Sequence, residues 1–365
     1  MDNIGGAEFV DLILAKELNA DIYTTNIDKE KIQKMGFSTD NIYSIGKIPI
    51  NAPFRQEFAY WRFRKLNLKN KYDFYIIAGD WAVSAAFNNK PNLWYVYSPK
   101  REIWDLYDYV RINTVPWHKR LIFDVWVFIR RILDKRDVKN VQKIICISKN
   151  VQNRVKKYLN RDSKIIYPPT ENKDFYYNKS KGYWLSVNRL IEHKRVDIQL
   201  KAFAKIPDEK LIIIGSYEKS SHFQKYAEYC KKIKPQNVEI RSWVDKKELT
   251  ELYANCKGVI ATSKDEDYGM NVVEAMASGK PVIASNEGGF KETLINEKTG
   301  ILIDHIDEEK LIEAIKIFGE KIEKNPLRLK NLCQKQAKNF DTKIFIKKFK
   351  EEIKNEKTGF SDSSR

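Results

Sequence analysis

The sequence has few of the residues that hold small folds together through covalent bonds or metals. It contains four cysteines and four histidines among 365 residues, and neither set forms a close pair or a cluster. We therefore expect no disulfide framework and no metal cage, and a reducing cytoplasm fits best. No apolar run approaches the roughly 20 residues that cross a bilayer. The first residues also lack the basic and apolar segments of a signal peptide.

Acidic residues are too few to balance the basic ones, and the formal net charge is +17. Such an excess favours an anionic partner: a phosphorylated substrate, an anionic membrane surface or nucleic acid. A solvated lysine-rich surface is an equal alternative, because many lysines fall on segments with ordinary helical patterns, such as 343–357. Zinc-finger spacing, RNP-like aromatic strands and a basic zipper are missing, so we expect no nucleic-acid partner.

Short apolar runs alternate with segments of helical spacing along most of the chain. The runs expected to form buried strands are 75–79, 94–97, 144–147, 183–187, 211–214, 238–240, 259–261 and 281–284. This alternation is typical of parallel sheets with helices on both faces. The length suits two such domains. We expect an α/β protein with two doubly wound, Rossmann-like domains facing across a cleft.

The domain boundary is expected at Tyr167-Pro168-Pro169-Thr170, since two prolines suit an extended linker. This division gives an N-terminal domain over 1–168 and a C-terminal domain over 169–340. A last helix over 341–357, with Asp341 as its N-cap, is expected to pack back on the N-terminal domain. Residues 358–365 are expected to be disordered. At the start, Gly5-Gly6 leads directly into a helical pattern, although such a turn normally follows a strand. The first strand of the N-terminal domain is therefore expected to be missing.

The segment that begins at Glu266 carries the clearest site pattern. An apolar strand delivers a loop with Glu266, and Gly269 lets the backbone approach a ligand closely. The helix from about Asn271 then directs its N-terminal N–H groups at the same place, where an anion can bind. Glu274 lies on the first turns of that helix, so two carboxylates can meet sugar and ribose hydroxyls. Taken singly, these residues would more often be surface charges around a turn.

Two cations follow the strand that begins at Tyr183. Arg189 and Lys194 lie after this strand and before a helical pattern. Fixed cations at the carboxyl end of a strand suit a diphosphate leaving group, whose charge grows as a sugar departs. The alternative is an ordinary charged helix start.

With Ala275-Met276-Ala277, Gly279, Pro281 and 287–292, the Glu266–Glu274 spacing resembles the E-x7-E motif of retaining family 4 glycosyltransferases of GT-B architecture. The resemblance implies that Glu266 contacts the donor sugar and Glu274 the ribose. It assigns the diphosphate to Arg189 and Lys194. The further donor-binding residues that it implies are Gly6, Tyr268, Gly269, Met270 and Asn271. Gly5 would border the acceptor.

The strand end at Tyr97 departs from the pattern of that family, in which a His-Thr/Ser-Pro-x-Arg sequence is usual. Ser98, Pro99 and Arg101 match, but Tyr97 stands at the histidine position. A tyrosine, with a pKa near 10, is a poor base at neutral pH. Either Tyr97 positions the sugar, or activity is altered. The leaving phosphate is usually described as the base in such transfer, so the missing histidine need not abolish turnover. On the acceptor side, Ser98 borders the site and Arg101 could meet an anionic acceptor such as a lipid phosphate.

The resemblance implies a metal-independent, retaining hexosyltransferase with a GDP- or UDP-linked donor and no other cofactor. The acceptor would be a polysaccharide, glycolipid or lipid-linked oligosaccharide, and the nearest patterns look like mannosyltransferases. The alternative is a catalytically impaired, glycosyltransferase-like protein that binds nucleotide or acts as a scaffold. We interpret 117–133 as a core helix with a charged stripe. The competing interpretation is a membrane-surface helix, which would place the protein at the inner face of the cell membrane.

Overall fold

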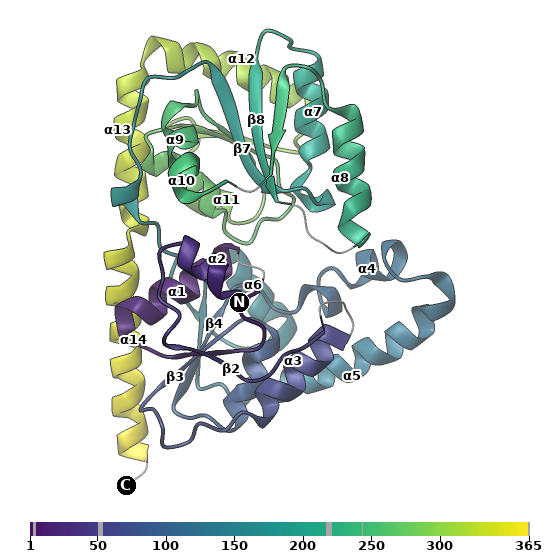
Figure 1. The fold of residues 1–365 in the computed structure, drawn as a ribbon, viewed down its shortest axis with the longest axis vertical. Helices are drawn as coiled ribbons and strands as arrows, with labels where there is room; N and C mark the ends of the chain where they lie inside the picture. Colours follow the sequence, from purple (N-terminus) through teal and green to yellow (C-terminus); the bar gives the residue numbers. More distant parts are fainter. Residues whose placement is uncertain (3–4, 50–53, 217–220, 243, 364–365) are drawn as a thin grey trace. The chain divides into compact units, whose positions relative to one another are not determined.

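The computed structural model describes residues 1–2, 5–49, 54–216, 221–242 and 244–363. The chain forms two compact units, one of Met1–Tyr167 with Phe345–Arg365 and one of Pro168–Ile344. The first crossing between units falls within the Tyr-Pro-Pro-Thr stretch, and the chain returns to the first unit inside its last helix (Figure 1). Each unit is built from parallel strands with helices packed around them.

The second unit contains a six-stranded parallel sheet in the order β12-β11-β10-β7-β8-β9. Its strands are β7 (Tyr183–Arg189), β8 (Lys210–Ser216), β9 (Val238–Arg241), β10 (Val259–Ala261), β11 (Val282–Ser285) and β12 (Gly300–Ile303). The helices are α7 (Val196–Ala204), α8 (Ser221–Ile233), α9 (Lys246–Asn255), α10 (Met270–Ala277), α11 (Phe290–Thr293), α12 (Glu308–Lys324) and α13 (Pro326–Ala337). Apolar strand residues such as Trp184, Ile213 and Ile283 are buried. Their burial against α7 and α12 drives the packing of this unit.

The first unit contains two separate parallel sheets, β1-β2 and β3-β4-β5-β6. The strands are β1 (Ile22–Thr24), β2 (Ile42–Ser44), β3 (Tyr75–Ala78), β4 (Asn92–Val96), β5 (Lys143–Cys146) and β6 (Lys164–Ile165). The helices are α1 (Gly6–Leu18), α2 (Lys29–Lys34), α3 (Phe54–Lys65), α4 (Tyr107–Asn113), α5 (Arg120–Val138), α6 (Lys149–Arg154) and α14 (Thr342–Ser363).

A cavity of about 810 Å³ is lined by both sheets of the first unit. Residues of β1 and β3 line it, together with side chains of α1 and α14. In a doubly wound sheet of order 3-2-1-4-5-6, the strands β2, β1, β3, β4 and β5 would take every position except the central one. Within the part of the chain that the structure describes, no strand fills that position. The cavity therefore lies at the position that a strand preceding Gly5-Gly6 would take in this order.

Helix α14 packs on the sheet of the first unit. Tyr95 of β4 lies 5.9 Å from Phe345 and 5.0 Å from Phe349, measured between ring centroids. Lys143 of β5 pairs with Glu352 at 2.6 Å. The helix continues to Ser363, whereas the sequence predicted a disordered tail from residue 358. Glutamate and lysine before this point favour helix and extend it, whereas residues 364–365 lie outside the described residues.

The interpretation of 117–133 as a core helix is also wrong. Helix α5 buries Val127, Arg130 and Asp134, while Leu121 and Ile122 are more than two thirds exposed. The inward face is fixed by charged contacts, because Asp134 forms a buried ion pair with Lys100. The apolar stripe of this helix consequently faces away from the core.

Candidate functional site

The order of the strands reverses in the second unit between β7 and β10, which pair in parallel. Ligands on doubly wound sheets bind beyond the carboxyl ends of the strands at such a switch point. Arg189 ends β7 and is exposed, and Lys194 follows in the turn before α7. Glu266 lies in the loop after β10. The fold therefore brings the two sequence patterns of the second unit to one place.

Lys194 and Glu266 form an ion pair, with 2.5 Å between Nζ and Oε2. Their side chains are only 13% and 17% exposed. Burial alone would raise the pKa of Glu266, but the charge and hydrogen bond of Lys194 lower that pKa to about 2. Glu266 is consequently a carboxylate at neutral pH. It can accept hydrogen bonds from hydroxyl groups of a ligand.

The backbone beside this pair is held by hydrogen bonds between the segments that follow β7 and β10. Thr262 Oγ1 donates to the carbonyl oxygen of Lys194 at 2.8 Å. The N–H of Lys264 donates to the carbonyl of His193 at 2.7 Å. The turn after β7 is thereby tied to the end of β10, which fixes the position of Lys194.

Three glycines allow the loop with Glu266 to pack closely. Gly269 has a φ of 89° and a Cβ there would lie 2.4 Å from the Phe290 ring. A Cβ on Gly288 would lie 2.2 Å from the carbonyl oxygen of Glu266. The N–H of Gly289 donates to that same oxygen at 2.8 Å. Larger residues would displace the loop, so these positions need glycine.

Helix α10 begins directly after Gly269 and directs its first N–H groups away from the helix body. Asn271 Nδ2 donates to the carbonyl of Val187 at 3.0 Å, which ties the helix start to β7. The Tyr268 side chain is buried and its ring packs on Phe340. Only the backbone of Tyr268 is therefore available to a ligand, whereas Met270, at the first helical position, is partly exposed. The helix N-terminus can receive an anion such as phosphate.

Glu274 has a partner that the sequence patterns did not reveal. The Tyr253 hydroxyl of α9 donates to Glu274 Oε2 at 2.8 Å. Burial raises the pKa of Glu274, and this hydrogen bond acts in the opposite direction. Tyr253 is fully buried, and a buried tyrosine hydroxyl needs a polar partner. That need is the one signal that could have linked the two residues.

Arg195 and Glu287 form a second ion pair next to the site. Arg195 reaches Glu287 with two nitrogens, at 2.8 and 3.1 Å. Glu287 also accepts from the N–H of Asp265 at 3.2 Å. This bidentate contact ties the start of α7 to the loop before Glu266. The sequence suggested no more than a charged helix start at Arg195.

The remaining predicted residues belong to the first unit. Gly5 caps α1, and its N–H donates to Glu8 at 2.9 Å; Gly6 is the first helical residue. Ser98 accepts a hydrogen bond from Arg154 at 3.2 Å. Arg101 donates to Asp105 at 2.9 Å. Arg101 is thus engaged by a carboxylate of its own chain.

Tyr97 follows β4 and donates its hydroxyl to Asp11 Oδ1 on α1 at 2.5 Å. Burial, followed by the nearby Asp11 charge, raises the pKa of Tyr97 well above 10. Burial also raises the pKa of Asp11 to about 7, although the Tyr97 hydrogen bond opposes that shift. Tyr97 therefore keeps its proton at neutral pH and cannot act as a base there.

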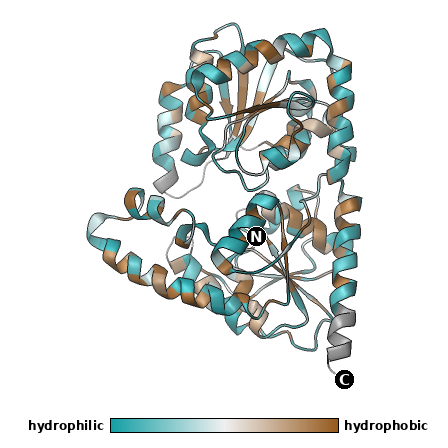
Figure 2. Ribbon diagram, turned by 180° about the vertical axis from the view of Figure 1, so that it is seen from behind, coloured by the Kyte–Doolittle hydropathy of each residue, from teal (hydrophilic) through white to brown (hydrophobic). Residues whose placement is uncertain are grey.

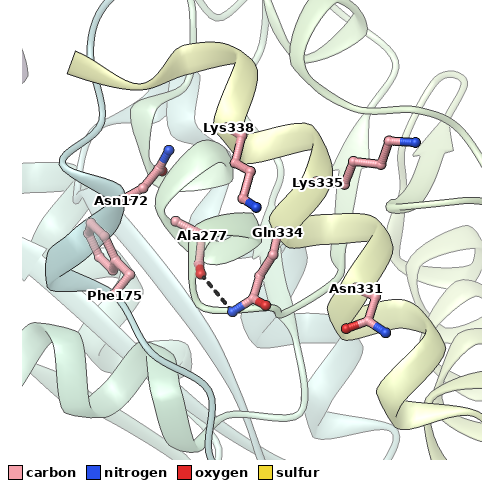
Figure 3. A pocket seen from close by; sticks show the side chains of 7 residues that line it. All are labelled: Asn172, Phe175, Ala277, Asn331, Gln334, Lys335 and Lys338. Atoms are coloured by element: carbon pink, nitrogen blue, oxygen red, sulfur yellow. Dashed lines mark hydrogen bonds between the residues drawn. The ribbon is translucent and has the colours of Figure 1, made fainter. Parts of the chain in front are cut away.

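A cavity of about 330 Å³ in the second unit contains none of the predicted site residues (Figure 3). Its lining residues are Asn172, Phe175, Ala277, Asn331, Gln334, Lys335 and Lys338. Gln334 donates to the carbonyl of Ala277 at 3.4 Å, which links α13 to the end of α10. We interpret this cavity as a gap in the packing of these helices.

The second unit matches a known family over nearly its whole length. The family model described as glycosyl transferases group 1 covers residues 168–340. O-antigen chain mannosyltransferase RfbU of Salmonella typhimurium is 30% identical over 49% of this chain and 51% of that protein. Alpha-1,3/1,6-mannosyltransferase ALG2 of Dictyostelium discoideum is 32% identical over 33% of this chain and 34% of that protein. The chain therefore spans about half the length, or less, of these curated relatives.

Solved structures resemble the chain over nearly its full length. HepE from Anabaena in complex with UDP-glucose has a TM-score of 0.72 at 14% identity, over 97% of both chains. A glycosyltransferase from Rickettsia africae has a TM-score of 0.68 at 17% identity, over 96% of this chain and 95% of that one. At such identities the likeness concerns the fold alone. The predicted α/β fold of GT-B type, with its Rossmann-like sheets, is confirmed.

Proposed function

We propose that the protein is a retaining glycosyltransferase, because residues 168–340 match the family model described as glycosyl transferases group 1. It moves a hexose from a nucleoside-diphosphate sugar to a polysaccharide, glycolipid or lipid-linked oligosaccharide. The observation that carries the proposal is the Lys194–Glu266 pair beside the N-terminus of α10, at the switch point of the sheet. This arrangement supports the proposal, because a donor site needs a cation, a carboxylate and helix N–H groups close together.

Each part of that site has a separate task in the proposed transfer. Arg189, Lys194 and the α10 N-terminus stabilise the diphosphate as the bond to the sugar breaks and negative charge develops. Glu266 accepts hydrogen bonds from hydroxyls of the departing sugar and orients it. Glu274, held by Tyr253 at 2.8 Å, accepts hydrogen bonds from the ribose. No metal ion is required, because cations and helix N–H groups neutralise the diphosphate.

The proton of the acceptor hydroxyl passes to the leaving phosphate in this proposal. Tyr97 cannot take it, because its pKa lies well above 10 and its hydroxyl already donates to Asp11. We assign Tyr97 a positioning role instead. Gly5, Gly6, Ser98 and Arg101 remain proposed residues of the acceptor side.

The identity of the donor is proposed from the similar proteins. RfbU and ALG2 are named mannosyltransferases, and the HepE structure contains UDP-glucose. A GDP- or UDP-linked hexose fits both, and GDP-mannose is the first donor to test. Isothermal titration calorimetry against a panel of nucleotide sugars identifies it. Binding of one donor by the wild type, with binding lost in Lys194→Met, supports the proposal; no binding of any donor contradicts it.

A second candidate function is nucleotide binding without transfer. The observation that favours it is Tyr97, which replaces the usual histidine and is hydrogen-bonded to Asp11. Under this alternative the protein binds a donor but releases no nucleoside diphosphate with any acceptor, and Tyr97→His does not change that result. Transfer by the wild type removes this candidate. Proton NMR of the product then tests retention, since the new bond must keep the anomeric configuration of the donor.

A further inference from the structure

Helix α5 carries a continuous apolar stripe that faces away from the core. Six of its apolar side chains are 49% to 75% exposed. They are Leu121, Ile122, Val125, Phe128, Ile129 and Ile132. Steps of three and four residues place them on one side of the helix. Figure 2 shows the hydrophobic positions repeating along this long helix.

The inward face of the same helix is charged, which fixes its orientation. Arg130 and Asp134 are buried, and Asp134 pairs with Lys100. Rotation of the helix to bury its apolar stripe would expose these ion pairs and leave their partners unpaired in the core. The stripe is consequently a stable feature of the surface of this unit.

Helix α3 adds a second apolar stripe beside the first. Phe54, Phe58 and Trp61 are 64%, 49% and 51% exposed. The two helices are in contact, because Glu57 accepts hydrogen bonds at 2.7 Å from Trp126 and from Arg130. Further along both helices, a nitrogen of the Arg64 side chain lies 3.6 Å from Asp137. Residue numbers increase together along the contact, so α3 and α5 run in the same direction.

The two stripes lie on the same side of this helix pair. On α3, Phe58 comes one residue after Glu57, which faces α5. On α5, Val125 and Ile129 come one residue before Trp126 and Arg130, which face α3. Each residue turns a right-handed helix by about 100°. In two parallel helices that face each other, the residue after the contact on one helix and the residue before the contact on the other point to the same side of the pair. We call these nine residues the α3–α5 apolar surface.

Uncompensated positive charge surrounds the α3–α5 apolar surface. Helix α3 has four basic residues and one acidic residue, and α5 has five basic residues and three acidic residues. The four carboxylates already have basic partners. These pairs are Glu57–Arg130, Asp124–Arg111, Asp134–Lys100 and Asp137–Arg64. Lys65, Lys119, Lys135 and Lys139 are exposed at the ends of the two helices. An anionic layer complements such a surface.

We infer that the α3–α5 apolar surface docks on an anionic membrane. Its apolar side chains enter the boundary between headgroups and acyl chains, and the surrounding lysines and arginines contact anionic headgroups. Exposed Trp61 and Trp117 suit this depth, because tryptophan is enriched at membrane interfaces. Self-association through the same surface would bring two positively charged patches together, which opposes a dimer. The inference rests on the first unit and is independent of the donor site.

Vesicle co-sedimentation of the whole chain tests this inference. We expect binding to vesicles of phosphatidylcholine with 30% phosphatidylglycerol at about 0.1 M salt, and at least tenfold weaker binding to pure phosphatidylcholine. The triple variant Ile122→Ser, Phe128→Ser, Ile129→Ser should bind the anionic vesicles at least tenfold more weakly than the wild type. Ile317→Ser with Leu327→Ser is the matched control, since these exposed apolar residues lie in the other unit.

Three results would overturn the inference. One is failure of the wild type to bind anionic vesicles; another is equal binding by the wild type and the triple variant. The third is a wild-type dimer in light scattering that the triple variant converts to a monomer, without vesicle binding by either. Circular dichroism and nucleotide binding of the triple variant should match the wild type, which separates loss of docking from loss of the fold or the donor site.

Discussion

The Nζ atom of Lys194 lies 2.5 Å from Glu266 Oε2, in a pair that links the end of β7 to the loop after β10. Without a ligand, the cation proposed for the diphosphate is neutralised by the carboxylate proposed for the sugar. The pair thus keeps two buried charges satisfied until a donor arrives. A donor with both a diphosphate and a hydroxylated sugar can engage both partners at once, which favours it over free phosphate.

Replacement of Glu266 should affect both stability and turnover. Glu266→Gln leaves the Lys194 ammonium without its charged partner, and we expect a loss of about 3 kcal/mol in the free energy of unfolding. Turnover should fall at least a hundredfold, since the carboxylate no longer orients the sugar. Urea denaturation and release of nucleoside diphosphate measure the two effects. Glu323→Gln, an exposed change in the same unit, should alter neither.

The same pair predicts how stability depends on pH. The pKa of Glu266 is lowered from 4.5 to about 2 in the fold. Its contribution to stability is therefore present above pH 4.5 and is lost as the pH falls from 4.5 towards 2. In Lys194→Met the buried carboxylate lacks its cation, so its pKa moves above 4.5 and the local slope reverses. Subtraction of the stability profile of Lys194→Met from that of the wild type isolates the contribution of this pair. Parallel profiles of the two proteins would refute this contribution.

The Tyr97–Asp11 contact predicts that stability depends on pH with the opposite sign. The pKa of Asp11 is raised from 3.8 to about 7, so its burial weakens the fold as the pH rises from 4 through 7. Asp11→Asn keeps an acceptor for the Tyr97 hydroxyl and removes the charge. We expect this variant to be more stable than the wild type at pH 8 by about 1–3 kcal/mol, and equal to it at pH 4. A variant less stable than the wild type at both pH values would contradict this assignment.

Parts of the fold were predictable because continuous apolar runs indicate buried strands. The run at 259–261 matches β10 residue for residue, and the run at 211–214 forms the middle of β8 (Lys210–Ser216). The strands β1, β2, β6 and β12 were missed. The first three have only two or three residues, which include tyrosine, serine or lysine and carry no clear period. The four-residue strand β12 was not among the expected runs. Helix α5 was oriented wrongly because periodicity reveals two faces but not which face is buried. The Asp134–Lys100 pair decides that question, and it joins residues far apart in the sequence.

Residues of the candidate site could be proposed from local patterns, but their contacts with residues of distant elements could not. Glycine turns, helix starts and charged residues after strands marked Lys194 and Glu266. Contacts between distant elements, such as Tyr253 with Glu274 and Arg195 with Glu287, are set by packing and leave no local pattern.

The cavity between β1 and β3 predicts that an added strand will stabilise the first unit. The Met1 amine is largely buried there, and this burial lowers its pKa from 8.0. A peptide bond at this nitrogen removes the buried charge, and apolar side chains can fill the cavity of about 810 Å³. Six apolar residues fused ahead of Met1 should raise Tm by at least ~4 °C and slow amide exchange in β1 and β3. A Gly-Ser extension of equal length is the control, and equal Tm values would disprove the effect.

Metal removal should leave turnover unchanged. Asp265-Glu266-Asp267 forms an Asp-x-Asp sequence, which in other proteins can hold a divalent cation. Here Glu266 is paired with Lys194, and no cluster of three potential metal ligands forms among the residues that the structure describes. We expect equal rates in EDTA and in added Mg²⁺ or Mn²⁺. A loss of more than tenfold in EDTA, restored by either ion, would show that a metal takes part.

The most direct test of the proposed donor site is release of nucleoside diphosphate by the wild type and by Glu266→Gln. Purified protein is mixed with GDP-mannose, UDP-glucose and other donors, and release is followed with and without a glycan or lipid-linked acceptor. We predict release from one donor by the wild type, acceleration by acceptor, and at least a hundredfold loss in Glu266→Gln but not in Glu323→Gln. Equal release by the wild type and Glu266→Gln would contradict the account.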